Sequence, residues 1–334
     1  MIDIHQINPD ERPEIDNTKE RYCAEIAGEN IISDIGEVTF AGLMDKMKQL
    51  KPAKCKARRS EQSGELIAHA LREINTLTQL DLGNNSILAE GGKAIAQALL
   101  ENKTLTHLNL SINKISDEGG KAIAQALREN TTLTQLDLSS NEISDVGGKA
   151  IARALRENKT LAHLTLRSNK ITCEGGVSIA QALRENKVLR QFNFGGNKIS
   201  DEGGEAFAQA LRENTTLTQL DLSYNSISDI GGKAIVQALQ ENTALVHLDL
   251  KFNEISDGGG KAIGKALRKN TALTQLELDY NEISDEGGND IAQALRENKT
   301  LTNIYLYGNN ISDEGKQAFA QALRENTTLT CLDL

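Results

Sequence analysis

The chain has 334 residues, a net charge of −10, no tryptophan and only 3% aromatic residues. Binding to nucleic acid needs a basic surface, so this acidic composition excludes nucleic acid as the expected partner. No stretch approaches the roughly 20 apolar residues of a membrane span, and the first residues lack the basic and apolar segments of a secretion signal, so we expect neither.

The N-terminal 60 residues differ from the rest of the chain. Residues 1 to about 29 are polar and hold two of the three prolines, so we expect an extended lead. Residues 30–44 match the second half of a unit that returns later, which predicts a degenerate first repeat whose helix continues to about Leu50. Residues 51–59 are the one basic run, and we interpret them as a solvated connector in preference to an anion contact.

A 28-residue unit then fills residues 61–334, as a first helix, nine full repeats and a terminal strand. Its opening leucine returns every 28 residues without insertion, at Leu77, Leu105, Leu133, Leu161, Leu189, Leu217, Leu245, Leu273, Leu301 and Leu329. A period of this length indicates stacked supersecondary units, each of which buries its apolar face only against its neighbours.

Each unit has a strand half and a helix half. Leu136 and Leu138 lie two apart, so a strand would turn both to one face. Ser144 is the predicted N-cap of the following helix, and Asn158 is expected to end it in the left-handed conformation. The predicted apolar stripe of the helix is Ala150, Ile151, Ala154 and Leu155.

The strand half follows the pattern L-x-x-L-x-L-x-x-N-x-I, which resembles the leucine-rich repeat. Units of 28 residues with a full helix are similar to the ribonuclease-inhibitor-like subclass. The resemblance implies an α/β horseshoe solenoid in which the asparagine satisfies backbone groups of the turn. Strands stack at about 4.8 Å and helices at about 8–10 Å, so we expect the parallel sheet on the concave face and the helices on the convex face.

No catalytic signature is present. The sequence contains no GxxxxGK[ST], HExxH or GxSxG motif, so we expect no enzyme activity, no cofactor and no small-molecule substrate. The recurrent Gly-Gly pair is interpreted as helix-start geometry, because it returns in nearly every unit. His107 and His163 lie two strands apart without an obvious third ligand, so hydrogen-bonded histidines are favoured over a zinc site.

The candidate site consists of side chains that depart from the repeat. Tyr224, Phe252 and Tyr280 share the slot before the asparagine and should stack as a ladder. Further residues beside them complete the predicted partner-binding set, which adds Tyr305, Tyr307, Asp221, Asp249, Glu277 and Lys251. Clustered exposed aromatic residues are typical of protein-binding hot spots. The alternative is that duplication spread these residues and that stacking alone maintains them.

These features predict a non-catalytic scaffold that binds a basic protein partner, since carboxylates beside rings suit arginine or lysine. Two alternatives stay open: a GTPase-activating protein of the leucine-rich repeat type, and a self-association module that uses the uncapped C-terminal end. That end predicts a native chain that continues past Leu334. Four cysteines without a CxxC motif favour the reduced cytoplasm. Similar arrays occur in NOD-like sensors and in bacterial effectors, which implies the host cytosol if the chain is bacterial.

Overall fold

The computed structural model describes residues 37–39, 62–73 and 76–334. Within these limits, residues from Glu37 to Leu334 belong to one compact unit. The predicted polar lead, most of the degenerate first repeat and the basic run at residues 51–59 lie outside the described residues.

In the described residues, eleven short strands form one parallel sheet in sequence order. They are β1 (Glu37–Thr39), β2 (Gln79–Asp81), β3 (His107–Asn109), β4 (Gln135–Asp137), β5 (His163–Thr165), β6 (Gln191–Asn193), β7 (Gln219–Asp221), β8 (His247–Asp249), β9 (Gln275–Glu277), β10 (Asn303–Tyr305) and β11 (Cys331–Asp333). From β2 onward, each residue pairs with the residue 28 positions further on, as Leu136 does with Leu164. The predicted terminal strand is β11, paired with β10.

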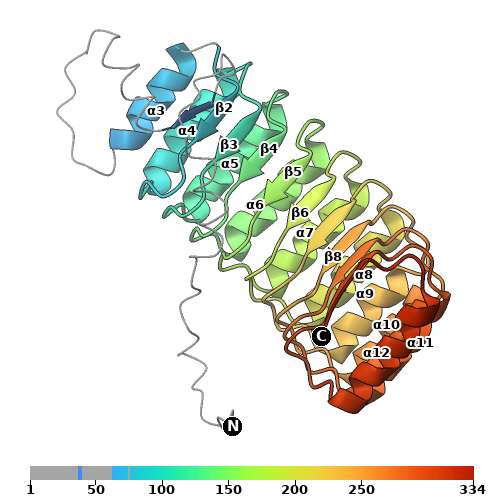
Figure 1. Cartoon of the computed structure of the whole chain (residues 1–334). Helices are drawn as coiled ribbons and strands as arrows, with labels where there is room; N and C mark the ends of the chain where they lie inside the picture. Colours follow the sequence, from blue (N-terminus) through green and yellow to red (C-terminus); the bar gives the residue numbers. More distant parts are fainter. Residues whose placement is uncertain (1–36, 40–61, 74–75) are drawn as a thin grey trace, which may run out of the picture. The chain divides into compact units, whose positions relative to one another are not determined.

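A helix follows every strand from β2 to β10. The helices are α3 (Gln62–Glu73), α4 (Ala89–Glu101), α5 (Asp117–Glu129), α6 (Asp145–Glu157), α7 (Cys173–Glu185), α8 (Asp201–Glu213), α9 (Asp229–Ala238), α10 (Asp257–Leu267), α11 (Asp285–Glu297) and α12 (Asp313–Glu325). Figure 1 shows the strands side by side along one side of the array and the helices along the other. The predicted α/β solenoid is therefore confirmed. None of these helices is both long and apolar enough to cross a membrane.

The segment Glu37–Thr39 departs from the prediction. We expected it to lie in a helix of the degenerate repeat, but it forms strand β1 and pairs in parallel with β2. The physical reason is the edge of the sheet, where the backbone groups of β2 would otherwise lack partners. Val38 and Thr39 are β-branched, so an extended backbone suits them better than a helix.

The core lies between the sheet and the helices. Leu136 and Leu138 are 2% and 0% exposed, as their spacing predicts. In helix α6 the buried residues include Ile151, Ala152 and Leu155, whereas Ala150 of the predicted stripe is only partly covered. The core also includes four phenylalanines that replace leucine or isoleucine of the repeat, namely Phe192, Phe194, Phe207 and Phe319.

One column of asparagines joins the turns after the strands. In Asn141, Nδ2 donates to the carbonyl of Leu110 in the preceding repeat at 2.9 Å and to that of Leu138 at 3.1 Å. Its Oδ1 accepts the N–H of Ile115 at 3.0 Å. These bonds satisfy buried backbone groups that neither strand nor helix reaches, as the resemblance implies.

A second column of asparagines ends the helices. Asn158 follows α6 as predicted, but its backbone is extended (φ −66°, ψ 137°) and not left-handed. Its side chain fixes the helix end instead, because Nδ2 donates to the carbonyl of Leu127 and Oδ1 accepts the N–H groups of Thr160 and Leu161. The expected left-handed cap was wrong, since side-chain bonds to two repeats make that conformation unnecessary.

The helix starts are capped from the neighbouring repeat. Ser144 occupies the predicted N-cap position of α6, but its hydroxyl makes no cap bond to that helix. It donates to Oδ2 of Asp117 at 2.6 Å, while Oδ1 of Asp117 accepts the N–H groups of Ser144 at 2.8 Å and Gly147 at 2.9 Å. Although partial burial acts in the opposite direction, these bonds lower the pKa of Asp117. The same bond to the next repeat is made by Asp145, Asp201, Asp229, Asp257 and Asp285.

Cys173 interrupts this aspartate column. Its Sγ lies 3.2 Å from the backbone nitrogen of Ser200 and 3.1 Å from the hydroxyl of Ser200. A neutral thiol accepts hydrogen bonds weakly and adds no charge at the positive end of α8. The boundary between α7 and α8 therefore lacks the carboxylate cap that these aspartates provide.

Cys173→Asp is expected to raise the free energy of unfolding by about 1 kcal/mol at neutral pH, because a carboxylate restores the cap. The pKa of the equivalent Asp117 is lowered on folding from 3.8, so the gain is present above about pH 4 and disappears as the pH falls below that value. Urea unfolding at pH 7 and pH 3 measures it. Cys173→Asn, which lacks the charge, is the control and should gain less; no gain for Cys173→Asp at pH 7 would contradict the argument.

Candidate functional site

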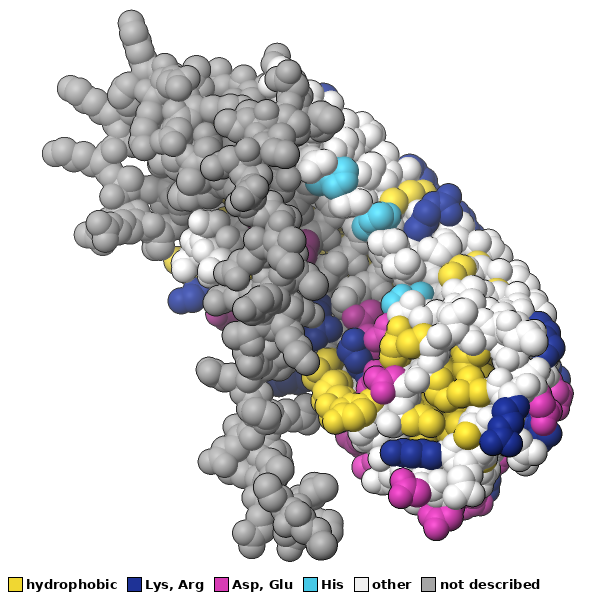
Figure 2. Space-filling model, in the orientation of Figure 1, with side chains coloured by type: hydrophobic (Ala, Val, Ile, Leu, Met, Phe, Trp, Pro, Cys, Tyr) yellow, Lys and Arg dark blue, Asp and Glu magenta, His cyan; other side chains and the backbone are white. Residues whose placement is uncertain are grey.

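The outward side chains of the strands form two rows, which we call the strand face. The middle residue of each strand from β2 to β10 is buried, and the residues on either side of it point outward. One row holds mostly glutamine and histidine, and the other mostly aspartate and asparagine. Figure 2 shows hydrophobic side chains gathered toward the C-terminal end of the array, with acidic and basic side chains beside them.

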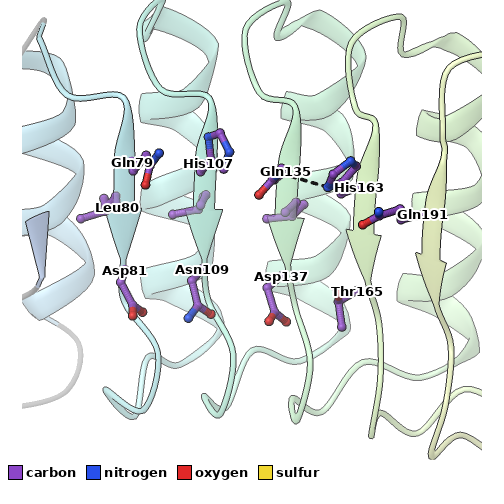
Figure 3. A pocket seen from close by; sticks show the side chains of 12 residues that line it. Gln79, Leu80, Asp81, His107, Asn109, Gln135, Asp137, His163, Thr165 and Gln191 are labelled. Carbon is purple, nitrogen blue, oxygen red and sulfur yellow. Dashed lines mark hydrogen bonds between the residues drawn. The ribbon is translucent and has the colours of Figure 1, made fainter. Parts of the chain in front are cut away.

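Over β2–β6 the strand face holds a hollow of about 380 Å³ (Figure 3). Gln135 lies between His107 and His163 and donates through Nε2 to Nδ1 of His163 at 3.0 Å. His107 shares a hydrogen bond of 2.8 Å with Thr106. Burial, with His107 nearby, lowers the pKa of His163, so this ring is neutral at pH 7. The described residues contain no group of three or more candidate metal ligands.

The predicted row of carboxylates is present on β7–β9. Asp221 pairs in register with Asp249, and Asp249 with Glu277. Lys251, a member of the predicted partner-binding set, lies between two of them: its Nζ is 3.0 Å from Oδ2 of Asp249 and 3.0 Å from Oε2 of Glu277. Nε2 of His247 lies 2.8 Å from Oε1 of Glu277. The chain itself thus supplies part of the positive charge that we had assigned to a partner.

Asp249 and Glu277 differ in acidity. Asp249 is only 4% exposed, and its burial, with Asp221 and Glu277 alongside, raises its pKa to about 7 from 3.8. Although burial acts in the opposite direction, hydrogen bonds from His247 and Lys251 lower the pKa of Glu277 to about 2. The charge of this row therefore changes near neutral pH through Asp249.

The aromatic ladder predicted from the sequence is confirmed. The ring centroids of Tyr224 and Phe252 lie 4.1 Å apart at 13°, and those of Phe252 and Tyr280 lie 4.2 Å apart at 17°. Tyr307 packs edge-on against Tyr280 at 5.5 Å, and these two side chains are 52% and 44% exposed. Tyr305 lies on β10 in register with Glu277, and its hydroxyl accepts a hydrogen bond from Asn303 at 3.3 Å.

The ladder slot has an unusual backbone. Tyr224, Phe252 and Tyr280 have φ between 52° and 53°, in the left-handed region. The repeats on either side place Gly196 (φ 64°) and Gly308 (φ 73°) in the same slot. A left-handed conformation costs a residue with a side chain roughly 1–2 kcal/mol, and glycine almost nothing. Folding alone therefore favours glycine where the chain has three aromatic residues.

The stack determines which parts of the rings a partner meets. Inside it, each ring face covers its neighbour. At one end the guanidinium carbon of Arg167 lies 5.1 Å from the centroid of Tyr224. At the other end a Cβ on Gly308 would lie 2.7 Å from Cδ1 of Tyr280, so backbone covers that face. In the free chain the ladder thus offers edges and hydroxyls, and a cation–π contact from a partner would need the face of Tyr224 that Arg167 covers.

Sequence reasoning missed Arg167. It contacts Asp221, Ser223 and Tyr224, which lie two repeats further along. The signal in the sequence was the position of Arg167 within the repeat. The equivalent position of the other repeats holds Gly83, Ser111, Ser139, Gly195, Ser223, Lys251, Asp279 and Tyr307. An arginine followed one repeat later by the pair Gly195–Gly196 has space to reach along the array.

Asp249→Asn is expected to raise the free energy of unfolding by about 1–2 kcal/mol at pH 8, because it removes a buried charge beside two carboxylates. The folded-state pKa of about 7 exceeds the ordinary 3.8, so ionisation penalises the folded state. This destabilisation of the folded state is absent below about pH 4, grows between pH 4 and pH 7, and is complete above pH 7. Urea unfolding at pH 4 and pH 8 tests this. Asp137→Asn, on a strand whose neighbours carry no carboxylate, is the control, and an equal effect at both pH values would argue against the assignment.

Comparison with known protein families identifies the repeat of this chain. The family described as Leucine Rich repeat matches nine consecutive segments, at residues 73–96, 101–124, 129–152, 157–180, 185–208, 213–236, 241–264, 269–292 and 297–320. No curated protein sequence matches the chain.

Solved structures that resemble the fold include two described as an internalin and a leucine-rich repeat domain. An internalin from Listeria monocytogenes shares 23% identity at a TM-score of 0.51, over 79% of this chain and 63% of its own. The leucine-rich repeat domain of APL1 shares 18% identity at a TM-score of 0.50, over 80% of this chain and 58% of its own. The matches thus span about three fifths of each of those proteins, and at this identity they show the fold alone.

The ribonuclease-inhibitor-like subclass stays a prediction, because neither comparison distinguishes subclasses. The nine matched segments coincide with the strand–turn–helix units of the structure, from β2 and α4 to β10 and α12. The chain therefore belongs to the leucine-rich repeat family.

Proposed function

We propose that this chain is a scaffold that binds another protein through the C-terminal part of its strand face and the aromatic residues beside it, and carries out no chemistry. The observation that carries the proposal is the aromatic ladder of Tyr224, Phe252 and Tyr280, held in a left-handed backbone slot. Tyr305 and Tyr307 extend this surface along the next repeat.

Folding energetics alone do not account for the ladder. Stacking contributes about 0.5–1.5 kcal/mol for each of the two ring pairs. Three left-handed residues together cost more than about 3 kcal/mol, so the ladder gives folding no net gain. A contribution to binding accounts for the rings, since partly exposed tyrosine and phenylalanine supply large contact area in hot spots. The stack also holds the rings in place before binding, which reduces the ordering entropy that a partner must offset.

The charge of the strand face supports a partner with basic residues. Strands β2–β11 carry six carboxylates and neither lysine nor arginine: Asp81, Asp137, Asp221, Asp249, Glu277 and Asp333. Lys251 and Arg167 compensate only part of this charge. Complementary charge chiefly increases the rate and specificity of association.

The proposal includes a reducing location, the cytoplasm or, for a bacterial protein, the cytosol of a host. Its support is the free state of Cys173 and Cys331, which lie on separate repeats of the described chain.

The test is the triple change Tyr224→Gly, Phe252→Gly and Tyr280→Gly. Glycine relieves the left-handed backbone, as at Gly196, so the array should keep its fold while it loses the rings. The immobilised wild-type chain is used to capture partners from lysate, and the purified partner is then titrated against both chains. We expect the triple variant to bind at least about tenfold more weakly.

A matched control changes the same slot in earlier repeats, with Asn84→Gly, Ser140→Gly and Ser168→Gly. These residues have the same left-handed backbone but no rings, so partner affinity should stay within about twofold of wild type. Circular dichroism verifies the fold of both variants. Equal affinity of the wild type and the aromatic triple variant would refute the ladder as the binding surface.

A further inference from the structure

Arg167 crosses a complete repeat to reach its contacts. Its Nη1 lies 3.7 Å from Oδ2 of Asp221 and 3.4 Å from the hydroxyl of Ser223. Its guanidinium carbon is 5.1 Å from the ring centroid of Tyr224. All three partners belong to the repeat that lies 56 residues further on, so the intervening repeat must leave room for the side chain.

The pair Gly195–Gly196 leaves that room. Gly195 occupies the same slot of the intervening repeat as Arg167 and Ser223 occupy in theirs. A Cβ on Gly195 would lie 2.7 Å from the hydroxyl of Ser223 and 3.0 Å from Oδ1 of Asp221. Any side chain there would therefore collide with the groups that Arg167 contacts. Gly196 likewise leaves the outer face of Tyr224 without a neighbouring ring in the ladder slot.

The three contacted groups match a guanidinium group. Asp221 offers negative charge, the hydroxyl of Ser223 offers a hydrogen-bond acceptor, and the face of Tyr224 offers a flat π surface. Ser223 is 0% exposed, and its hydroxyl makes no side-chain hydrogen bond in the described residues other than that with Arg167. Arginine uses all three features at once, whereas lysine lacks the planar group that stacks on a ring.

Arg167 occupies this set of groups only loosely. Its closest oxygen contacts, 3.4 and 3.7 Å, exceed the 2.7–2.9 Å that is typical of strong charged hydrogen bonds. A hollow of about 260 Å³ on the strand face is lined by Asp221, Gln219 and His247, among others, so the carboxylate is also reachable from the face that we assign to the partner.

We propose that Asp221, Ser223 and Tyr224 form a guanidinium receptor, which Arg167 fills in the free chain and an arginine side chain of the partner fills in the complex. This inference rests on the proposed function and specifies the partner's chemistry. Arg167 acts as an internal competitor, so the apparent affinity for an arginine is the intrinsic affinity multiplied by the fraction of molecules in which the receptor is empty.

The experiment uses short peptides in place of the unidentified partner. Acetyl-Gly-Arg-Gly-amide, its lysine analogue and its neutral citrulline analogue are titrated into the full chain and into Arg167→Ala, and amide NMR shifts of Ser223 and Tyr224 are followed. We expect the arginine peptide to bind Arg167→Ala at least about fivefold more tightly than wild type. The lysine peptide should gain less and the citrulline peptide should gain nothing.

Two controls separate the receptor from general electrostatics. Lys198→Ala removes one positive charge from an exposed position in the intervening repeat and should leave the affinity unchanged. Asp221→Asn added to Arg167→Ala should return the affinity to the wild-type value or below. An equal gain for Lys198→Ala, or an equal gain for the arginine and lysine peptides, would overturn the receptor.

Failure of the receptor proposal can be distinguished from failure of the proposed function. If the glycine triple variant loses the protein partner but Arg167→Ala gains no affinity for the arginine peptide, the scaffold stands and the receptor is wrong. If Arg167→Ala gains affinity for the arginine peptide while the triple variant, which lacks the Tyr224 ring, still binds the partner normally, the site binds arginine but neither it nor the ladder is the docking surface of the partner.

Discussion

The fold depends on hydrogen bonds that asparagine side chains make to the backbone of the preceding repeat. A solenoid turns its chain twice in every 28 residues, and each turn buries carbonyl and N–H groups that no strand or helix pairs. Asn141 satisfies such groups after the strand, and Asn158 does so after the helix. Because each side chain bonds to the repeat before its own, the spacing between repeats cannot vary without leaving a buried group unpaired. The constant period of the sequence is the consequence.

This rigidity explains why the sheet and helices were predictable from sequence. Once the period is known, every residue of one repeat inherits its place from the next, and the pairing of Leu136 with Leu164 follows. Contacts between repeats were harder to predict, because sequence pattern reasoning treats each unit alone. Ser144 has the composition of an N-cap, yet its hydroxyl bonds to Asp117 of the previous repeat. The first strand was missed for the same reason, since the exposed edge of β2 determines its conformation.

The candidate site was likewise predictable from the sequence only in part. The shared column of Tyr224, Phe252 and Tyr280 was sufficient to predict that the rings stack. Their left-handed backbone was not predictable from their type, because aromatic residues rarely adopt it. The reach of Arg167 was likewise hidden, since it depends on the absence of side chains one repeat away. Lys251 was assigned to partner binding because a linear sequence does not show that its long side chain lies between Asp249 and Glu277.

The strand face is better described as a charge arrangement that is already partly neutralised than as an open acidic surface. Lys251 neutralises the centre of the carboxylate row, and Arg167 reaches Asp221 at its N-terminal end over longer distances. A partner's positive charge at the centre would meet Lys251 and be repelled, whereas at Asp221 it meets a weakly held side chain that can move away. Specificity on this surface therefore depends on how firmly Lys251 and Arg167 are bound to their carboxylates. Because Arg167 is bound less firmly, its displacement by a positively charged residue of the partner costs less free energy.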